Sequence, residues 1–273
     1  GRVPVGHKPV VRIFEVDEPA SYARALFIEA LRRRGVRVGA SPLGDNDLDD
    51  LPPREQVLVM PTIVTYTSPP LREEIKVVLK VSHNLHASTL PLLVAAHHGE
   101  TTEREGLRRQ GRILKELGVD IATISFGGGA GGARADLATP RATVALLRAM
   151  AARPDYPAYE SALPVLGRDG TLAKAVDPDS PARGHARAKT GTYWLDNPLN
   201  GKSVLTSKAL AGTIDAADGR KLTFAFYVND VPMDATGVAV SEQTVAAGRL
   251  LGKLCEVFYG SAPAPSPAAG GSR

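Results

Sequence analysis

A cation, a hydroxyl and a glycine stand in immediate succession at Lys189-Thr190-Gly191. The stretch Ala186–Thr192 has the pattern of a β-strand, in which successive side chains face opposite ways. Lys189 and Gly191 are therefore expected on one face and Thr190 on the other. Glycine on an edge strand lets another backbone approach closely. The stretch predicts an edge where a substrate backbone can lie beside a positive charge.

A second polar group, Ser82-His83-Asn84, falls between two predicted helices. A serine and an asparagine two positions apart on a tight turn can aim into one pocket. There the hydroxyl can shuttle a proton and the amide can hold a substrate carbonyl. Taken alone, the turn favours the simpler role, in which Ser82 only caps the helix that follows.

The elements that must position these groups follow from hydrophobic periodicity and from capping signals. Helices are expected at residues 19–34, 71–80, 85–97, 103–117, 139–152 and 240–259. Strands are expected at residues 10–16, 36–38, 56–60, 186–192, 206–214 and 221–228, and residues 153–185 are expected to be irregular. Asp218-Gly219 is a hairpin signal between the last two strands.

Composition excludes several classes of function. The 273 residues are 43% hydrophobic, with a net charge of +4 that is dispersed along the chain and forms no aromatic-and-basic patch, so nucleic-acid binding is not expected. No apolar run is long enough for a transmembrane segment. The single cysteine, Cys255, permits no internal disulfide and is expected to be a buried structural thiol. Nothing in the sequence indicates an oligomeric state.

Together, the Ser-x-Asn and Lys-Thr-Gly groups resemble the second and third motifs of penicillin-recognising serine enzymes. The surrounding sequence extends this likeness. It comprises Thr67-Ser68-Pro69-Pro70-Leu71, the segments 79–87 and 188–192, and the segments 205–212 and 224–229. Over roughly residues 10–258 the chain resembles the D-alanyl-D-alanine carboxypeptidase/endopeptidase family of the penicillin-binding protein 4 type, peptidase family S13.

The resemblance implies an α/β (α+β) fold of the β-lactamase/transpeptidase type, here its C-terminal half, with an antiparallel sheet flanked by helices. It implies a serine acyl-enzyme mechanism on peptidoglycan peptides that end in D-Ala-D-Ala, with β-lactams as inhibitors. No cofactor and no metal are implied. The expected location is periplasmic or extracellular.

The resemblance also implies a role for each motif residue. Ser82 would relay a proton toward the leaving amine, and Asn84 would bind the substrate's amide. Lys189 would set the electrostatics of the pocket and hold the terminal carboxylate, with Thr190 or Thr192. The backbone of Thr192 would line the substrate strand beside Gly191 and offer an N–H to an oxyanion.

The nucleophile of the family, a serine in Ser-x-x-Lys, has no counterpart, because no serine here is followed three positions later by lysine. The chain is therefore expected to be a fragment that is inactive alone. Residues 1–66 would be the end of an inserted domain that returns into the transpeptidase domain. Residues 67–260 would be the part of that domain with the second and third motifs, and residues 261–273 a disordered tail.

Two other interpretations stay open. A chain with this half-site and no nucleophile could be a non-catalytic peptidoglycan-binding protein or one partner of a split enzyme. The histidines offer a metal-dependent hydrolase built on His83, His86, His97 and His98, although the chain has no His-Glu-x-x-His.

The glycine-rich stretch 127–132 formally matches a dinucleotide-binding fingerprint. Such a fingerprint needs a helix at its last glycine, and the next helix signal comes only at Thr139-Pro140. Gly128-Gly129-Ala130-Gly131 stands where many members of the family have an Asp-Gly-Ser-Gly turn. The stretch is therefore expected to be a turn that could line the active site.

Overall fold

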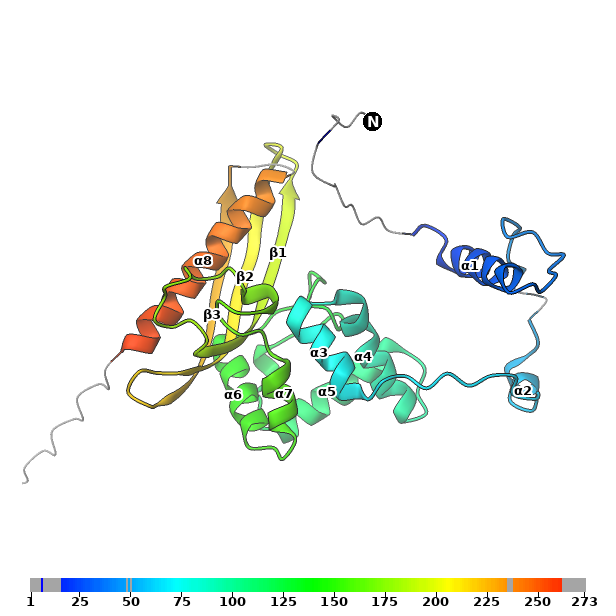
Figure 1. Ribbon diagram of the computed structural model, residues 1–273. Helices are drawn as coiled ribbons and strands as arrows, with labels where there is room; N and C mark the ends of the chain where they lie inside the picture. Colours follow the sequence, from blue (N-terminus) through cyan, green and yellow to red (C-terminus); the bar gives the residue numbers. More distant parts are fainter. Residues whose placement is uncertain (1–5, 7–15, 48, 50, 235–237, 262–273) are drawn as a thin grey trace, which may run out of the picture. The chain divides into compact units, whose positions relative to one another are not determined.

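The computed structural model describes residues 6, 16–47, 49, 51–234 and 238–261. The chain divides into two compact units, Gly1–Thr67 and Ser68–Arg273, which are described separately below (Figure 1). The strand predicted at 10–16 lies outside the described residues except for Val16, and so does the predicted tail except for Ser261.

Among its described residues, the first unit holds one long helix, α1 (Pro19–Arg33), and one short helix, α2 (Arg54–Val57). Pro19 starts α1 at a position where its missing N–H costs nothing, and Gly35 follows the helix with φ +82°. The strands predicted at 36–38 and 56–60 are wrong, because neither segment is extended against a partner. Val36, Val57, Leu58 and Val59 are exposed, and β propensity without a neighbouring strand does not make a strand.

The second unit is built on an antiparallel sheet of three strands in the order β1-β2-β3. The strands are β1 (Ala186–Asn197), β2 (Lys202–Asp215) and β3 (Lys221–Met233). The predicted hairpin turn between β2 and β3 is confirmed, with Gly219 at φ +84°. The β1–β2 register shifts once, between Tyr193 and Trp194.

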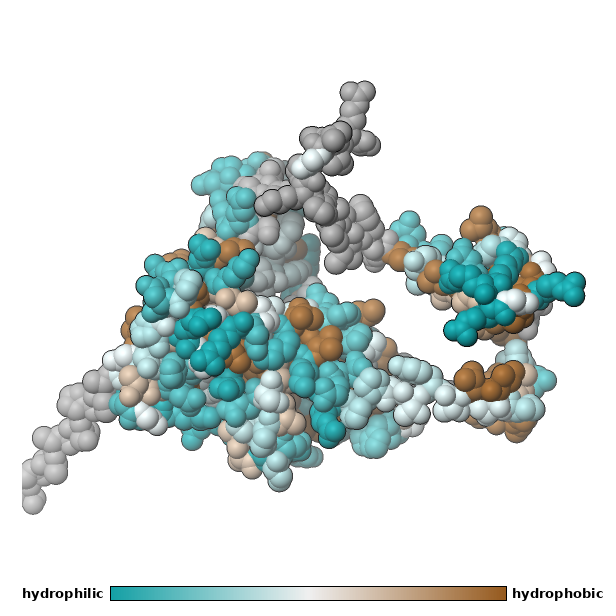
Figure 2. All heavy atoms as spheres, in the orientation of Figure 1, coloured by the Kyte–Doolittle hydropathy of each residue, from teal (hydrophilic) through white to brown (hydrophobic). Residues whose placement is uncertain are grey.

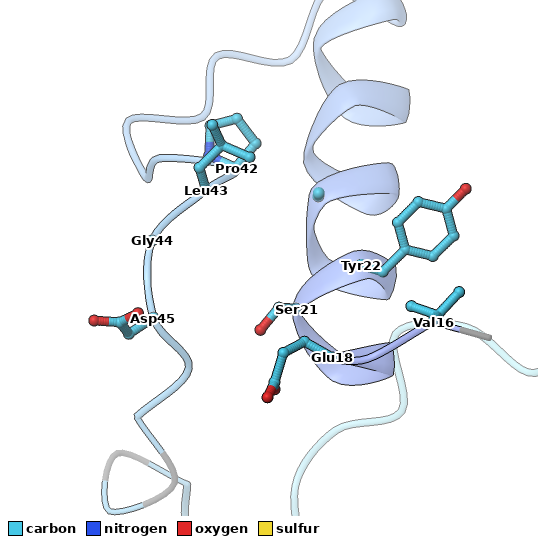
Figure 3. Close-up of a pocket in the computed structure, with 9 residues that line it drawn as sticks. Val16, Glu18, Ser21, Tyr22, Pro42, Leu43, Gly44 and Asp45 are labelled. Atoms are coloured by element: carbon cyan, nitrogen blue, oxygen red, sulfur yellow. The ribbon is translucent and has the colours of Figure 1, made fainter. Parts of the chain in front are cut away.

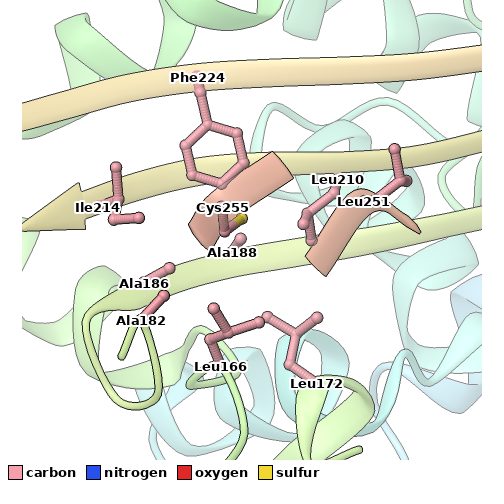
Figure 4. Close-up of a cluster of buried hydrophobic side chains, with 10 residues drawn as sticks. All are labelled: Leu166, Leu172, Ala182, Ala186, Ala188, Leu210, Ile214, Phe224, Leu251 and Cys255. Atoms are coloured by element: carbon pink, nitrogen blue, oxygen red, sulfur yellow. The ribbon is translucent and has the colours of Figure 1, made fainter. Parts of the chain in front are cut away.

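Helices cover both faces of this sheet. The long helix α8 (Val238–Gly260) packs on β2 and β3, and the main core cluster lies between this helix and the sheet (Figure 4). Its buried members are Leu166, Leu172, Ala182, Ala186, Ala188, Leu210, Ile214, Phe224, Leu251 and Cys255. Burial raises the pKa of Cys255 to about 12, which fits the predicted structural thiol. On the other face, α6 (Pro140–Ala151) contacts β3, and Thr139 caps it as predicted.

The remaining helices are α3 (Leu71–Val81), α4 (Asn84–His97), α5 (Glu103–Glu116) and α7 (Tyr156–Ala162). Two short 3-10 turns, η1 (Ile121–Thr123) and η2 (Gly170–Leu172), complete the unit. The prediction of irregular structure through 153–185 missed α7, which packs against α3. Within the described ranges, no helix combines the length and apolar character needed to span a bilayer.

The close packing of α4 against α5 supplies a stability prediction. A Cβ added at Gly106 of α5 would lie 1.8 Å from the carbonyl oxygen of Pro91 in α4. Gly106→Ala is therefore expected to lower the free energy of unfolding by roughly 2–3 kcal/mol. Gly111→Ala, on the same helix with nothing within 4 Å, should raise it by about 0.5–1 kcal/mol. Urea denaturation measures the free energy of unfolding of the two variants. Equal changes in both would contradict the close packing of α4 against α5 at Gly106.

Candidate active site

The turn between α3 and α4 projects the hydroxyl of Ser82. Ser82 follows the last residue of α3 in a left-handed backbone conformation, φ 59° and ψ 53°, and its N–H donates to the carbonyl of Val78. The next helix is capped by His83, whose Nδ1 accepts from the backbone N–H of His86 at 3.3 Å. The prediction that Ser82 caps α4 is therefore wrong, and its hydroxyl is left for another partner.

That partner is Lys189. Its Nζ donates to Ser82 Oγ at 2.7 Å, which joins two motifs that lie 107 residues apart in sequence. The same ammonium donates to the carbonyl oxygen of Thr190. Burial, and next the positive charge of Lys208, lower the pKa of Lys189 to about 8. Lys189 can therefore exchange a proton near neutral pH, and Ser82 can pass that proton on.

The outer edge of β1 is paired at its start and open farther along. Ala188 N–H donates to Pro164 O at 3.0 Å, and Ala186 O accepts from Leu166 N–H at 2.9 Å. Backbone groups alternate in direction along a strand, so those of Thr190 and Thr192 face the same outer edge. No described strand pairs with them there. An extended peptide can add to this edge as a further strand.

The two threonine hydroxyls beside Gly191 are held differently. Thr190 Oγ1 donates to Thr171 Oγ1 of η2 at 2.8 Å. Thr192 Oγ1 instead accepts from Lys208 Nζ of β2 at 2.7 Å. Gly191 itself lies between them, where an added Cβ would touch only Ala209, at 3.4 Å.

Asn84 is the first residue of α4, two positions after Ser82. Its side chain is exposed, and it makes no hydrogen bond with any residue in the described part of the chain. The structure therefore brings Ser82 and Lys189 into contact and leaves the Asn84 amide without a partner among the described residues.

A cleft of about 530 Å³ opens beside the β1 edge. It is lined by residues 189–193 of β1, parts of β2 and β3, and the glycine segment 128–131. A Cβ at Gly129 would lie 2.2 Å from Ala87 O, so the segment approaches α4 too closely for another residue type. Asp136 closes the turn by accepting from the N–H groups of Gly127 and Ala133, each at 2.7 Å. The glycine turn thus lines the cleft. A dinucleotide fingerprint would need a helix that begins at the last glycine, whereas α6 begins only at Pro140.

Sequence reasoning missed a link between α3 and the segment that leads into β1. Lys80 Nζ donates to Asp169 Oδ2 at 2.6 Å and to Leu163 O at 2.7 Å. The other oxygen of Asp169 accepts from Val165 N–H at 2.8 Å. This link fixes the end of α3, and so Ser82, relative to the strand that carries Lys189. No local pattern signals a contact that spans 89 residues.

The predicted four-histidine metal cluster is wrong. His83 and His86 lie together, with ring centroids 4.1 Å apart, and His86 pairs with Glu74 at 2.9 Å. His97 and His98 lie at the opposite end of the 14-residue helix α4, about 20 Å away. Across the described ranges, no three metal-binding side chains gather.

The first unit has its own small hollow of about 320 Å³ between α1 and the loop at 42–45 (Figure 3). Its polar groups hold this loop on the helix. Arg24 Nη1 donates to Gly44 O at 2.7 Å, and Ser21 Oγ accepts from Asn46 at 3.0 Å. Because these groups are already paired, the hollow is a weaker candidate than the cleft beside β1.

Known proteins resemble this chain in sequence over most of its length. The model of the D-Ala-D-Ala carboxypeptidase 3 (S13) family matches residues 1–248. A D-alanyl-D-alanine carboxypeptidase of Actinomadura sp. (strain R39) is 33% identical over 207 residues, which cover 74% of this chain and 37% of that protein.

Solved structures show the same fold. Penicillin-binding protein 4 from Haemophilus influenzae, in complex with a β-lactam, has a TM-score of 0.64 and 23% identity, over 91% of this chain and 53% of that one. A second structure of that protein has a TM-score of 0.56 and 22% identity, over 70% of this chain and 40% of the other. The present chain thus spans about half the length of these relatives or less, and it shares their helix-flanked antiparallel sheet of the transpeptidase type.

Proposed function

Since the chain belongs to the D-Ala-D-Ala carboxypeptidase 3 (S13) family, we propose that it supplies the proton relay and the substrate edge of a serine-type D-Ala-D-Ala carboxypeptidase/endopeptidase. The observation that carries the proposal is the 2.7 Å contact between Lys189 Nζ and Ser82 Oγ beside an unpaired strand edge. A cation, a hydroxyl and open backbone donors are the groups that acyl transfer to and from a serine needs.

In this mechanism the substrate peptide lies along the outer edge of β1 and pairs with the backbone of Thr190 and Thr192. The nucleophilic serine attacks the carbonyl of the penultimate D-alanine and loses its proton to the lysine of its own Ser-x-x-Lys motif, and the bond to the terminal D-alanine breaks. Ser82 donates a proton to the leaving nitrogen and is recharged by the Lys189 ammonium. Water then hydrolyses the acyl-enzyme ester and releases the shortened peptide.

The other motif residues bind the substrate. The exposed amide of Asn84 holds an amide of the peptide, and the Thr192 N–H stabilises the oxyanion. Lys189 also attracts the terminal carboxylate, together with the threonines on either side of Gly191. The substrate is a peptidoglycan stem peptide, so the protein acts in the cell wall, outside the cytoplasmic membrane, and β-lactams that mimic the peptide inhibit it.

The nucleophilic serine comes from a segment outside these 273 residues, which contain no Ser-x-x-Lys. Apolar side chains around the Ser82 turn support this arrangement. Val81 is 61% exposed and Leu85 is 69% exposed, and further apolar side chains gather where α3 and α4 lie (Figure 2). The segment with the nucleophile would cover them. In this reading residues 67–260 belong to the transpeptidase domain, and residues 1–66 end an inserted domain.

The test uses the complete gene product. It is expected to release D-alanine from an N-acylated peptide ending in D-Ala-D-Ala and to leave the L-Ala-L-Ala diastereomer intact. Benzylpenicillin should block the release and become covalently attached in a 1:1 ratio. A protein that binds the peptide and never hydrolyses it would instead support the non-catalytic peptidoglycan-binding alternative.

A further inference from the structure

Lys208 is a buried lysine on the face of the sheet that α8 covers. It lies directly opposite Thr192 in the β1–β2 register, so the two side chains share a face. Only 9% of Lys208 is exposed. A Cβ at Gly248 of α8 would come within 3.3 Å of Lys208 Cε, so the helix leaves just enough room for the lysine.

The burial of Lys208 is unusual, because burying an ammonium costs free energy unless a partner compensates its charge. No ion pair in the described part of the chain involves Lys208 or Lys189. Instead, the Lys208 ammonium donates to the hydroxyl of Thr192 at 2.7 Å. Two cations therefore flank the same stretch of β1 from opposite faces, and no carboxylate of the described residues neutralises either.

The hydroxyl of Thr192 transmits the effect of the Lys208 charge to the outer edge of β1, where the substrate is proposed to bind. Its oxygen accepts from Lys208, so its own proton is free to be donated, and a donor polarised by an ammonium is stronger than a neutral one. Thr192 is exposed, whereas the Thr190 hydroxyl already donates its hydrogen bond to Thr171 Oγ1. Thr192 is thus the one of the two threonines that can offer a charge-assisted O–H to an anion at the edge.

We propose that Lys208 is a positioning residue that gives this edge its preference for a free carboxylate, acting through the Thr192 hydroxyl. The proposal rests on the proposed function, because the carboxylate is that of the terminal D-alanine or of a β-lactam. Lys189, on the opposite face, attracts the same group directly and also serves the proton relay. Besides burial, the charge of Lys208 also lowers the pKa of Lys189, an effect that applies equally to both substrates compared below.

The experiment compares two substrates of the complete gene product, an N-acyl-D-Ala-D-Ala peptide and its C-terminal amide. Lys208→Met keeps the apolar stem and removes the charge. It is expected to lower kcat/KM for the free acid by roughly tenfold more than for the amide. In a double-mutant cycle, Lys208→Met should have little further effect on the acid once Thr192→Val is present. Lys208→Gln, which retains a donor without the charge, should show the same loss of preference and replaces Lys208→Met if that variant does not fold.

The outcomes separate the two proposals. A wild-type protein that hydrolyses neither substrate overturns the proposed function and this inference with it. Suppose that the wild-type protein prefers the acid and that the Lys208 variants lower kcat/KM equally for both substrates. Only the role of Lys208 is then overturned, and Lys208 is a structural side chain. Independent, additive effects of Lys208→Met and Thr192→Val would also refute the route through the hydroxyl.

Discussion

Replacing Lys189 with methionine is expected to remove penicillin acylation from the complete gene product while making the protein more stable. The ammonium of Lys189 donates to Ser82 Oγ at 2.7 Å, and in the proposed mechanism it recharges that hydroxyl. Loss of one preorganised group of this kind costs about 10²–10³-fold in rate. The second-order rate constant for labelling with a fluorescent penicillin measures the effect.

The gain in stability follows from the same burial. The pKa of Lys189 falls from 10.5 to about 8 in the folded protein, so the folded state binds this proton less tightly than the unfolded chain does. Stability therefore rises as the pH increases from about 8 to 10.5, and at pH 7 the buried charge is a cost. Lys189→Met should remove that cost, which is about 1–3 kcal/mol, and flatten this pH dependence.

Lys202→Met is the matched control, because Lys202 is an exposed lysine of the same sheet that pairs with Asp234. It should change neither labelling nor stability appreciably. Penicillin labelling of Lys189→Met at the wild-type rate would contradict the assigned role. A lower melting temperature of that variant at pH 7 would contradict the electrostatic cost.

Removing the Ser82 hydroxyl is expected to slow acylation strongly whichever residue replaces it, whereas stability should depend on the replacement. Ser82→Gly and Ser82→Ala both lose the relay to the leaving nitrogen, a proton transfer that contributes about 10²–10⁴-fold. The backbone at Ser82 is left-handed, with φ 59°, where alanine is strained and glycine is not. Ser82→Gly should therefore be more stable than Ser82→Ala by about 1 kcal/mol.

Thermal unfolding and penicillin labelling of the two variants check both parts. If either variant labelled as fast as the wild type, Ser82 would not be the relay. If alanine were the more stable replacement, the left-handed turn would not hold in solution, and the placement of the hydroxyl would lose its structural basis.

Much of the fold could be predicted from local signals in the sequence. Thr139-Pro140 marks the start of α6 because a threonine cap and a first-turn proline are both local features. The strands around Lys189 follow from the alternation of side chains between the two faces of a strand. The Asp218-Gly219 turn follows from its glycine, which adopts a positive φ. The valine-rich segment 56–60 shows the limit, because a strand needs a partner that its own sequence does not reveal.

The site was less predictable than the elements that build it. Ser82 and Lys189 could be paired only through the family resemblance, since spacing alone says nothing about a contact across 107 residues. His83 took the capping role expected of Ser82, because its ring nitrogen reaches the N–H of His86. Lys208 gave one signal that could have been used: it is a lysine within an otherwise apolar and small strand segment, where a charge is costly.

Mapping the residue that carries the penicilloyl group after benzylpenicillin treatment of the complete gene product would show directly which serine is the nucleophile. Peptide mass spectrometry identifies that residue. We expect the adduct on a serine of a Ser-x-x-Lys segment outside these 273 residues, with Ser82 unmodified. An adduct on Ser82 itself would contradict the proposed role of this residue, because the hydroxyl held by Lys189 would then be the nucleophile rather than the proton relay.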